Sequence, residues 1–200
     1  MTLVRKTLPL LLALSLDALA VDKDKNKFTP PDLDTLQTKL TVSDVTVGAA
    51  PYERPALAQA AFGKVNPYEH GILPVLVIIR NGSKGAIRLD AMRVEYHDRD
   101  RQVVSAIPAT EVAYAGGGPK RPTFGGPSIP GLGGRGKKNP LSSPEIEQRS
   151  FAAKMLPPGD TAYGFFYFRT GHRSGAQLYL TGMQEAATGK DIFYFEIPLD

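Results

Sequence analysis

The residues best suited to bind a partner are basic side chains clustered in a stretch rich in Gly and Pro. They are Lys120, Arg121, Arg135, Lys137 and Lys138. No Asp or Glu lies between residues 116 and 142, so this stretch is strongly cationic, whereas the whole chain carries a formal net charge of +4. An exposed cationic segment is attracted to anionic surfaces such as lipid head groups, lipopolysaccharide or acidic glycans. The alternative is a plain connector, because long loops are either functional or mere connections.

The residue types of a catalytic centre are present but are not arranged as one. The chain has no Gly-x-Ser-x-Gly turn to expose a nucleophile, and His172 and Ser174 lie in a polar stretch. Glu145 and Glu147 would form a carboxylate pair only if one of them lay buried in an apolar cleft, as general acid catalysis requires. We therefore expect no catalytic residues and a protein that is not an enzyme.

Metal and cofactor motifs are also incomplete. The chain has no Cys, and its three His are far apart in the sequence. Ligand-type side chains gather near one expected strand end, at Glu95, His97, Asp98 and Asp100. Their spacing lacks the Gly and the distal Glu of a calcium loop. Residues 131–136 have the spacing of a dinucleotide fingerprint but not its flanking strand and helix. We expect neither a metal nor a cofactor.

The N-terminus has the composition of a secretory signal peptide. Arg5 and Lys6 precede an apolar run over residues 8–16, and residues 18–20 (Ala-Leu-Ala) form a small-x-small cleavage site. This run is shorter than the roughly 20 residues that span a bilayer. We expect residues 1–20 to be removed, and the mature chain, without a transmembrane segment, to be periplasmic or extracellular.

The rest of the chain divides into short strands separated by turn residues. Alternating or continuous apolar patterns predict about eight strands, with a short helix over residues 54–62 and a helix start at residue 143. Changes in the alternation at Ser43-Asp44 and near Ala91 predict bulges. The core is expected to contain the aromatic residues Phe165, Phe166, Tyr167, Phe168, Phe193, Tyr194 and Phe195.

These patterns predict an all-β fold in one domain. Residues 21–37 are expected to be a flexible leader, residues 38–200 an antiparallel β-sandwich, and residues 115–142 a disordered insertion that forms a long Gly/Pro-rich loop. The turn chemistry of residues 81–85 is favoured over the glycosylation sequon that the same residues spell.

Two segments of the chain have a recognisable pattern. The first is the run 76–81 (Leu-Val-Ile-Ile-Arg-Asn) with Ile87 and Leu89, and the second is Leu-Pro-Pro-Gly at 156–159 leading to Gly-Phe-Phe-Tyr-Phe at 164–168. With these segments the chain resembles exported bacterial immunoglobulin-like sandwiches, a family found in small lipoproteins and cell-envelope proteins. The resemblance covers residue 39 to the C-terminus and implies an immunoglobulin-like fold and an envelope location. The chain lacks the anchor Cys of the lipoproteins and carries the Gly/Pro insertion, so no site residue is transferred.

We therefore expect an exported, non-enzymatic binding or envelope-associated module that uses edge strands and the basic loop. Its partner would be an anionic envelope surface, a glycan or another envelope protein. Nucleic acid is not expected, because the basic residues are confined to one segment and do not spread over a folded face. Two alternatives stay open, namely an exported hydrolase of an envelope polymer and a structural subunit that joins partners by strand addition.

Overall fold

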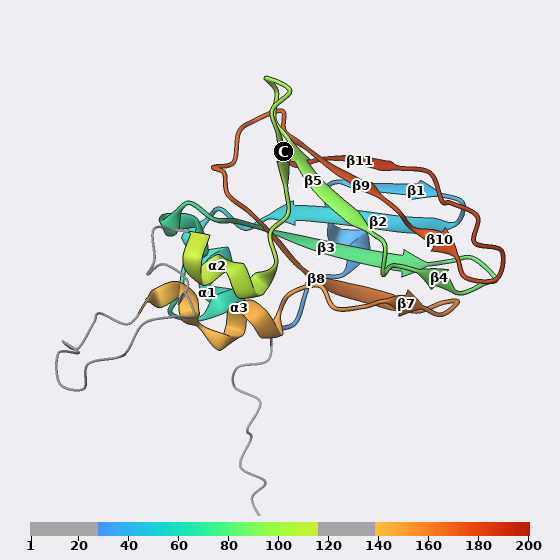
Figure 1. Ribbon diagram of the computed structural model, residues 1–200, viewed down its shortest axis with the longest axis horizontal. Helices are drawn as coiled ribbons and strands as arrows, with labels where there is room; N and C mark the ends of the chain where they lie inside the picture. The colour runs from blue at the N-terminus through green and yellow to red at the C-terminus, as the bar shows by residue number, and fades with distance from the viewer. Residues whose placement is uncertain (1–27, 116–138) are drawn as a thin grey trace, which may run out of the picture.

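The computed structural model describes residues 28–115 and 139–200, and the strands in it form three antiparallel sheets (Figure 1). The first, here called the β3 sheet, has the order β1 (Lys39–Val42), β2 (Val45–Pro51), β3 (Leu73–Asn81), β8 (Thr161–Phe168). The second, the β5 sheet, has the order β11 (Phe195–Pro198), β9 (Gln177–Thr181), β5 (Arg93–His97), β6 (Val103–Ser105). A small sheet joins β10 (Gln184–Glu185), β4 (Ile87–Arg88) and β7 (Met155–Leu156). The expected all-β class is confirmed, although the described residues form eleven strands, several of only two residues.

The helices are short, and they are η1 (Leu33–Thr35), α1 (Pro55–Phe62), η2 (Pro67–His70), α2 (Ala109–Ala115), η3 (Pro140–Ser142) and α3 (Pro144–Gln148). The three α-helices lie together on one side of the strands (Figure 1). Pro lies at the start of α1 and of α3, where its missing N–H costs no hydrogen bond. The helices expected over residues 54–62 and from residue 143 are thus present.

The main core lies between the β3 sheet and the β5 sheet. Val75, Val77 and Ile79 of β3 are fully buried and belong to one cluster with Tyr96 of β5 and Leu180 of β9. Successive side chains of a strand point to opposite faces, so these alternate residues form one face of β3. The two sheets therefore pack face to face around a common apolar layer.

A second cluster covers the opposite face of the β3 sheet. Leu76 and Ile78 of β3 lie in it with Phe62 of α1, Val112 of α2 and Ile146 of α3. This helical layer explains why β3 is apolar at almost every position, as the prediction of a central strand with both faces covered required. The sequence pattern did not indicate that helices on both sides of the basic stretch would form part of this layer.

The first predicted bulge is wrong, because Ser43 and Asp44 form a hairpin turn. Both residues have positive φ, 50° and 62°, and Val42 pairs directly with Val45 across the turn. Two central residues with positive φ match the strand twist in a two-residue hairpin. The change of alternation marks the point at which the chain reverses from β1 into β2.

The second predicted bulge is also wrong, because the expected strand over residues 86–96 is two strands in different sheets. β4 pairs with β7 and β10, whereas β5 pairs with β6 and β9. Met92 donates its N–H to the Leu89 carbonyl over 3.1 Å, which closes a turn between them. Gly182 packs against this turn so closely that a Cβ there would lie 2.3 Å from the Ala91 carbonyl oxygen.

The aromatic core prediction holds for one run and fails for part of the other. Phe165, Tyr167, Phe168 and Phe195 are at most 1% exposed, and Phe166 is half-buried. Phe193 and Tyr194 are 70% and 52% exposed, so their assignment to the core is wrong. The reason is that β11 begins only at Phe195: alternation from that buried residue puts Tyr194 outside, and Phe193 lies in the connection before the strand, where alternation does not apply.

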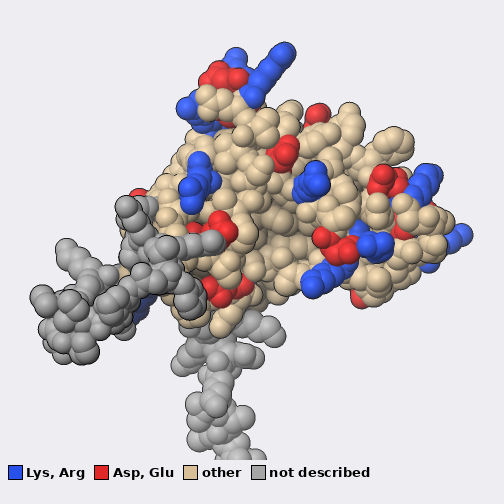
Figure 2. All heavy atoms as spheres, in the orientation of Figure 1, with Lys and Arg blue, Asp and Glu red and all other residues tan. Residues whose placement is uncertain are grey.

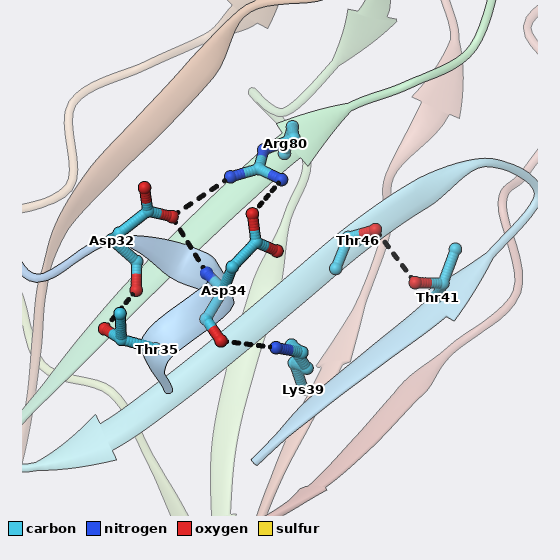
Figure 3. A network of polar contacts seen from close by, with 7 residues as sticks. All are labelled: Asp32, Asp34, Thr35, Lys39, Thr41, Thr46 and Arg80. Atoms are coloured by element: carbon cyan, nitrogen blue, oxygen red, sulfur yellow. Dashed lines mark hydrogen bonds and ion pairs between the residues drawn. The ribbon is translucent and has the colours of Figure 1, made fainter. Parts of the chain in front are cut away.

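The end of the expected leader is part of the folded domain. Leu33 is 2% exposed, and Arg80 of β3 donates to Asp32 over 3.3 Å and to Asp34 over 3.0 Å (Figure 3). These contacts tie η1 to the β3 sheet. The signal peptide, the first part of the leader and residues 116–138 of the expected insertion lie outside the described residues, while its described edges belong to α2 and η3.

Asn81 organises the turn that follows β3. Its fully buried side chain donates to the carbonyls of Gly85 over 2.8 Å and Leu156 over 3.0 Å. Its Oδ1 accepts from the N–H and the hydroxyl of Ser83, over 3.0 and 2.7 Å. These contacts agree with the turn predicted for residues 81–85, and a buried amide is inaccessible to glycosylation in the folded protein.

Candidate functional site

The outer face of the β5 sheet is the first candidate surface. Val94 and Tyr96 of β5 point into the core, so Glu95 and His97 point outward, and on β9 the same alternation puts Tyr179 outside. The helices pack on the β3 sheet, on the other side of the molecule from this face. No helix of residues 28–115 and 139–200 therefore covers this face.

Aromatic side chains line up on this face. The rings of His97 and Tyr179 stack with centroids 5.1 Å apart, and Tyr194 continues the row at 5.2 Å from Tyr179. We call these three residues the aromatic row. Cross-strand ring pairs of this kind stabilise a sheet. The exposure of Tyr194 and of the adjacent Phe193 is more than sheet stability requires, so these side chains are also available for contact.

Carboxylates flank the aromatic row. In the strand register, Tyr179 lies directly opposite Glu95 on one side and Glu196 on the other. Glu95 Oε2 lies 3.0 Å from His97 Nε2, and both side chains are about one-third exposed. The face thus combines aromatic rings and Tyr hydroxyls, which are enriched at binding surfaces, with two carboxylate acceptors.

A groove of about 780 Å³ is the second candidate. One wall is formed by residues 35–38, and another by residues 49–54 at the end of β2 and just beyond it. His172, Ser174, Leu199 and Asp200 complete it. Its volume lies within the range of pockets that hold small ligands.

Two polar groups of the groove lining lack partners among the described residues. Tyr52 is 4% exposed, and no described residue hydrogen-bonds its hydroxyl. Burial raises the pKa of Tyr52 to about 12, so the hydroxyl stays protonated and can donate. Nδ1 of His172 is buried without a hydrogen bond, although the His172 backbone N–H donates to the Tyr68 hydroxyl over 3.1 Å. A buried group without a partner, such as this Nδ1, calls for a ligand or a strained role.

The groove also holds the residue types of a hydrolase triad. His172, Ser174 and Asp200 all line it. Within the described part of the chain, however, no hydrogen bond joins the His172 ring to Ser174 or to Asp200, and the Asp200 carboxylate accepts the Gly175 N–H over 3.0 and 2.7 Å. The groove offers hydrogen-bonding groups rather than an assembled nucleophile and base.

The acidic residues singled out in the sequence have structural partners. Arg173 Nη1 lies 3.4 Å from Asp98 and 3.0 Å from Asp100, so a guanidinium occupies the place between these carboxylates. No group of three or more His, Asp or Glu suited to a metal occurs among residues 28–115 and 139–200. A hydrogen bond from the Ser143 hydroxyl lowers the pKa of Glu145, which is the opposite of what a general acid needs.

The predicted basic contacts are not placed by the structure. Lys120, Arg121, Arg135, Lys137 and Lys138 lie outside the described residues. On the face shown in Figure 2, basic and acidic side chains of the described residues are interspersed, without a single-sign field. None of the described helices has the length and hydrophobicity needed to cross a membrane.

Sequence reasoning missed the aromatic row and the groove. The alternation of residues 176–181 predicts that Tyr179 points to the face opposite to Leu178 and Leu180, so the outward position of Tyr179 could have been predicted. Nothing in the sequence brings Tyr52 near His172, because 120 positions separate them and only the folded sheets unite them.

The comparisons with known proteins give distant similarities. No protein-family model matches the sequence, and no curated protein matches it. A Bacillus subtilis protein provisionally described as a lipoprotein is 10% identical with a TM-score of 0.38, and the match covers 80% of this chain but 38% of the other. A Bordetella pertussis protein provisionally named ApaA is 13% identical with a TM-score of 0.34, over 80% of this chain and 97% of the other. Scores this low identify neither a common fold nor a shared function.

Proposed function

We propose that the protein is an exported, non-enzymatic binding module that contacts its ligand through the outer face of the β5 sheet. The observation that carries the proposal is the aromatic row, on a sheet face that the described helices leave uncovered, together with the exposed ring of Phe193, which precedes Tyr194 in the sequence. The ligand would belong to the cell envelope, as a glycan, a lipid surface or another envelope protein.

Large aromatic side chains are costly to expose to water, so their exposure on a folded domain needs a reason. A contiguous exposed apolar patch on a soluble domain marks an interaction site more often than chance. Tyr suits such a site because it brings a large contact area and a hydroxyl at a low cost in side-chain entropy. Glu95 and Glu196 on either side of Tyr179 would fix the orientation of hydroxyl or amide donors on a ligand.

We also propose an immunoglobulin-like fold and an exported location for the protein. Two antiparallel sheets packed face to face support an immunoglobulin-like sandwich, to which the helical layer on the β3 sheet is an addition. The signal-peptide composition of residues 1–20 supports export. Pulse-labelled precursor should shorten by the length of the signal peptide, and recovery of an uncleaved cytosolic protein would contradict the location.

The binding experiment compares surface variants of the mature protein on immobilised envelope fractions. The double variant Phe193→Ser and Tyr194→Ser removes the exposed rings, and we expect at least about a tenfold loss of retention. Tyr163→Ser is the matched control, because Tyr163 is 44% exposed but lies on β8 in the other sheet. Equal retention of both variants would assign the binding to another surface.

The basic stretch supplies a separate test of the anionic contact predicted from the sequence. Neutralising its five basic residues together should abolish retention on anionic vesicles or acidic glycans, and retention of the wild type should fall as salt rises. Retention that neutralisation and salt leave unchanged would make the stretch a connector.

A further inference from the structure

Among the described residues, no strand pairs with the outer side of the end of β2, and we call this the open edge of the β3 sheet. β1 pairs with β2 as far as Lys39 and Gly48, and Thr38 adds the last contacts, to Ala49. On its other side β2 stays paired with β3 to its end, and Tyr52 still donates its N–H to the Pro74 carbonyl over 2.8 Å. Hydrogen-bonding groups of an antiparallel strand alternate between its two sides. The Pro51 carbonyl is therefore directed to the side that β1 has left, and the same alternation, continued past Tyr52, would direct the Glu53 N–H to that side.

The segment before β1 does not continue along this edge, because contacts of η1 and Leu36 hold it away from the end of β2. A straight continuation of β1 would put Leu36 opposite Pro51, but Leu36 donates its N–H to the Leu33 carbonyl over 3.2 Å. Leu33 and Leu36 pack onto Gly48, where a Cβ would lie 2.6 and 2.7 Å from their methyl carbons. The ion pairs of Arg80 with the acidic residues of η1 fix the same segment (Figure 3). The edge is thus kept open by specific contacts.

The groove lies beside this open edge. It is lined by hydrogen-bonding groups that have no hydrogen-bond partner among the described residues. The Pro51 carbonyl and the Glu53 N–H have no hydrogen bond among the described residues. The same holds for the Tyr52 hydroxyl and for the buried Nδ1 of His172. Glu53 and Arg54 at the rim supply one charge of each sign, and neither has an ion-pair partner in the described part of the chain.

We infer that the groove binds a short extended peptide, which adds to the open end of β2 as a strand. A peptide N–H would donate to the Pro51 carbonyl, and a peptide carbonyl two residues away would accept from the Glu53 N–H. Main-chain hydrogen bonds supply affinity in this mode, and pockets for alternate side chains supply specificity. An acceptor and a donor two residues apart on a strand edge match an extended main chain, and charges of both signs suit its side chains. This site is separate from the aromatic row.

The test selects short random peptides displayed on phage against the mature protein, and measures the synthetic winners by fluorescence polarisation. Ser174→Trp fills the groove from an exposed position on its wall, and Ser174→Ala is its matched control. Glu53→Pro removes the edge N–H, whereas Glu53→Ala keeps it. We expect Ser174→Trp and Glu53→Pro to weaken binding at least about tenfold, and the two alanine variants to change it by less than about threefold.

Thermal melting of every variant separates a lost site from a lost fold. If Glu53→Pro unfolds the protein, the peptide affinities of Ser174→Trp and Ser174→Ala are sufficient to test the inference. The double variant of Phe193 and Tyr194 should bind the selected peptides as the wild type does. Failure to enrich any peptide, or peptides that bind Ser174→Trp as tightly as the wild type, would overturn the inference and leave the proposal for the β5 sheet intact.

Discussion

Replacing Asn81 tests whether its buried side chain stabilises the fold by joining the turn after β3 to Leu156 of β7. Its side chain makes four hydrogen bonds, two to carbonyl oxygens and two from Ser83, in a site with no solvent exposure. In Asn81→Ala the Ser83 hydroxyl is released from Oδ1 and can donate to the Gly85 carbonyl 3.0 Å away, but the Leu156 carbonyl loses the Asn81 amide. Each bond lost in a buried site costs about 1 kcal/mol, and an unsatisfied buried group costs about 1–3 kcal/mol. We expect a loss of about 2–4 kcal/mol in the free energy of unfolding, measured by urea denaturation.

Asn81→Asp refines the same test because it keeps the shape and removes the donors. The new carboxylate would face the carbonyls of Gly85 and Leu156 in a buried site, which raises the pKa of that carboxyl in the folded state above its unfolded value. A raised folded-state pKa gives stability that is present at low pH and lost as pH rises through it. The deficit against the wild type should therefore be larger near pH 7 than near pH 4. A deficit independent of pH, or a cost of Asn81→Ala below about 0.5 kcal/mol, would refute the role assigned to this side chain.

Three further predictions concern stability. Phe165→Ala should cost about 3–5 kcal/mol and Phe193→Ala less than about 1 kcal/mol in urea unfolding, because the first ring is buried and the second exposed; similar costs would contradict the core assignment. Gly164→Ala should lower the melting temperature strongly, since its Cβ would lie 2.4 Å from a neighbouring Cα, whereas Gly85→Ala, which meets nothing within 4 Å, should not. Deleting residues 116–136 should leave the melting temperature almost unchanged, because loop length has a small effect on closure entropy; unfolding of the deletion variant would show that this segment supports the fold.

The sequence predicted correctly those strands, helices and turns whose conformation depends mainly on residues close together in the chain. β3 was visible as a continuous apolar run with Pro at its start, and α1 as an Ala-rich stretch after Pro55. Both signals arise from residues next to one another in the chain. The turn at residues 81–85 was predictable for the same reason, since Asn, Ser and Gly favour it within a few positions.

The errors come from patterns that several structures share. A change in alternation at Ser43-Asp44 fits a bulge and a hairpin equally well, and only the pairing of Val42 with Val45 decides between them. Near Ala91 a similar change in alternation marks the point at which the chain passes from β4 in the small sheet to β5 in the β5 sheet. Phe193 and Tyr194 are as hydrophobic as core residues, so composition alone could not place them on the surface.

The candidate sites were beyond sequence reasoning because they are assembled across the fold. The aromatic row joins His97 of β5 to Tyr179 of β9 and to Tyr194, which come together through strand pairing. The groove joins the end of β2 to residues 172–174. An open strand edge becomes visible only when the path of the preceding chain is known.

The most direct test of the proposed function is hydrogen–deuterium exchange of the mature protein with and without an envelope fraction. Exchange reports protection of the strands that a ligand covers, even when the ligand is one component of a mixture. The proposal predicts slower exchange in β9 and in residues 193–196, with no change in β8. Protection confined to other segments, or no protection at all, would contradict binding on the outer face of the β5 sheet.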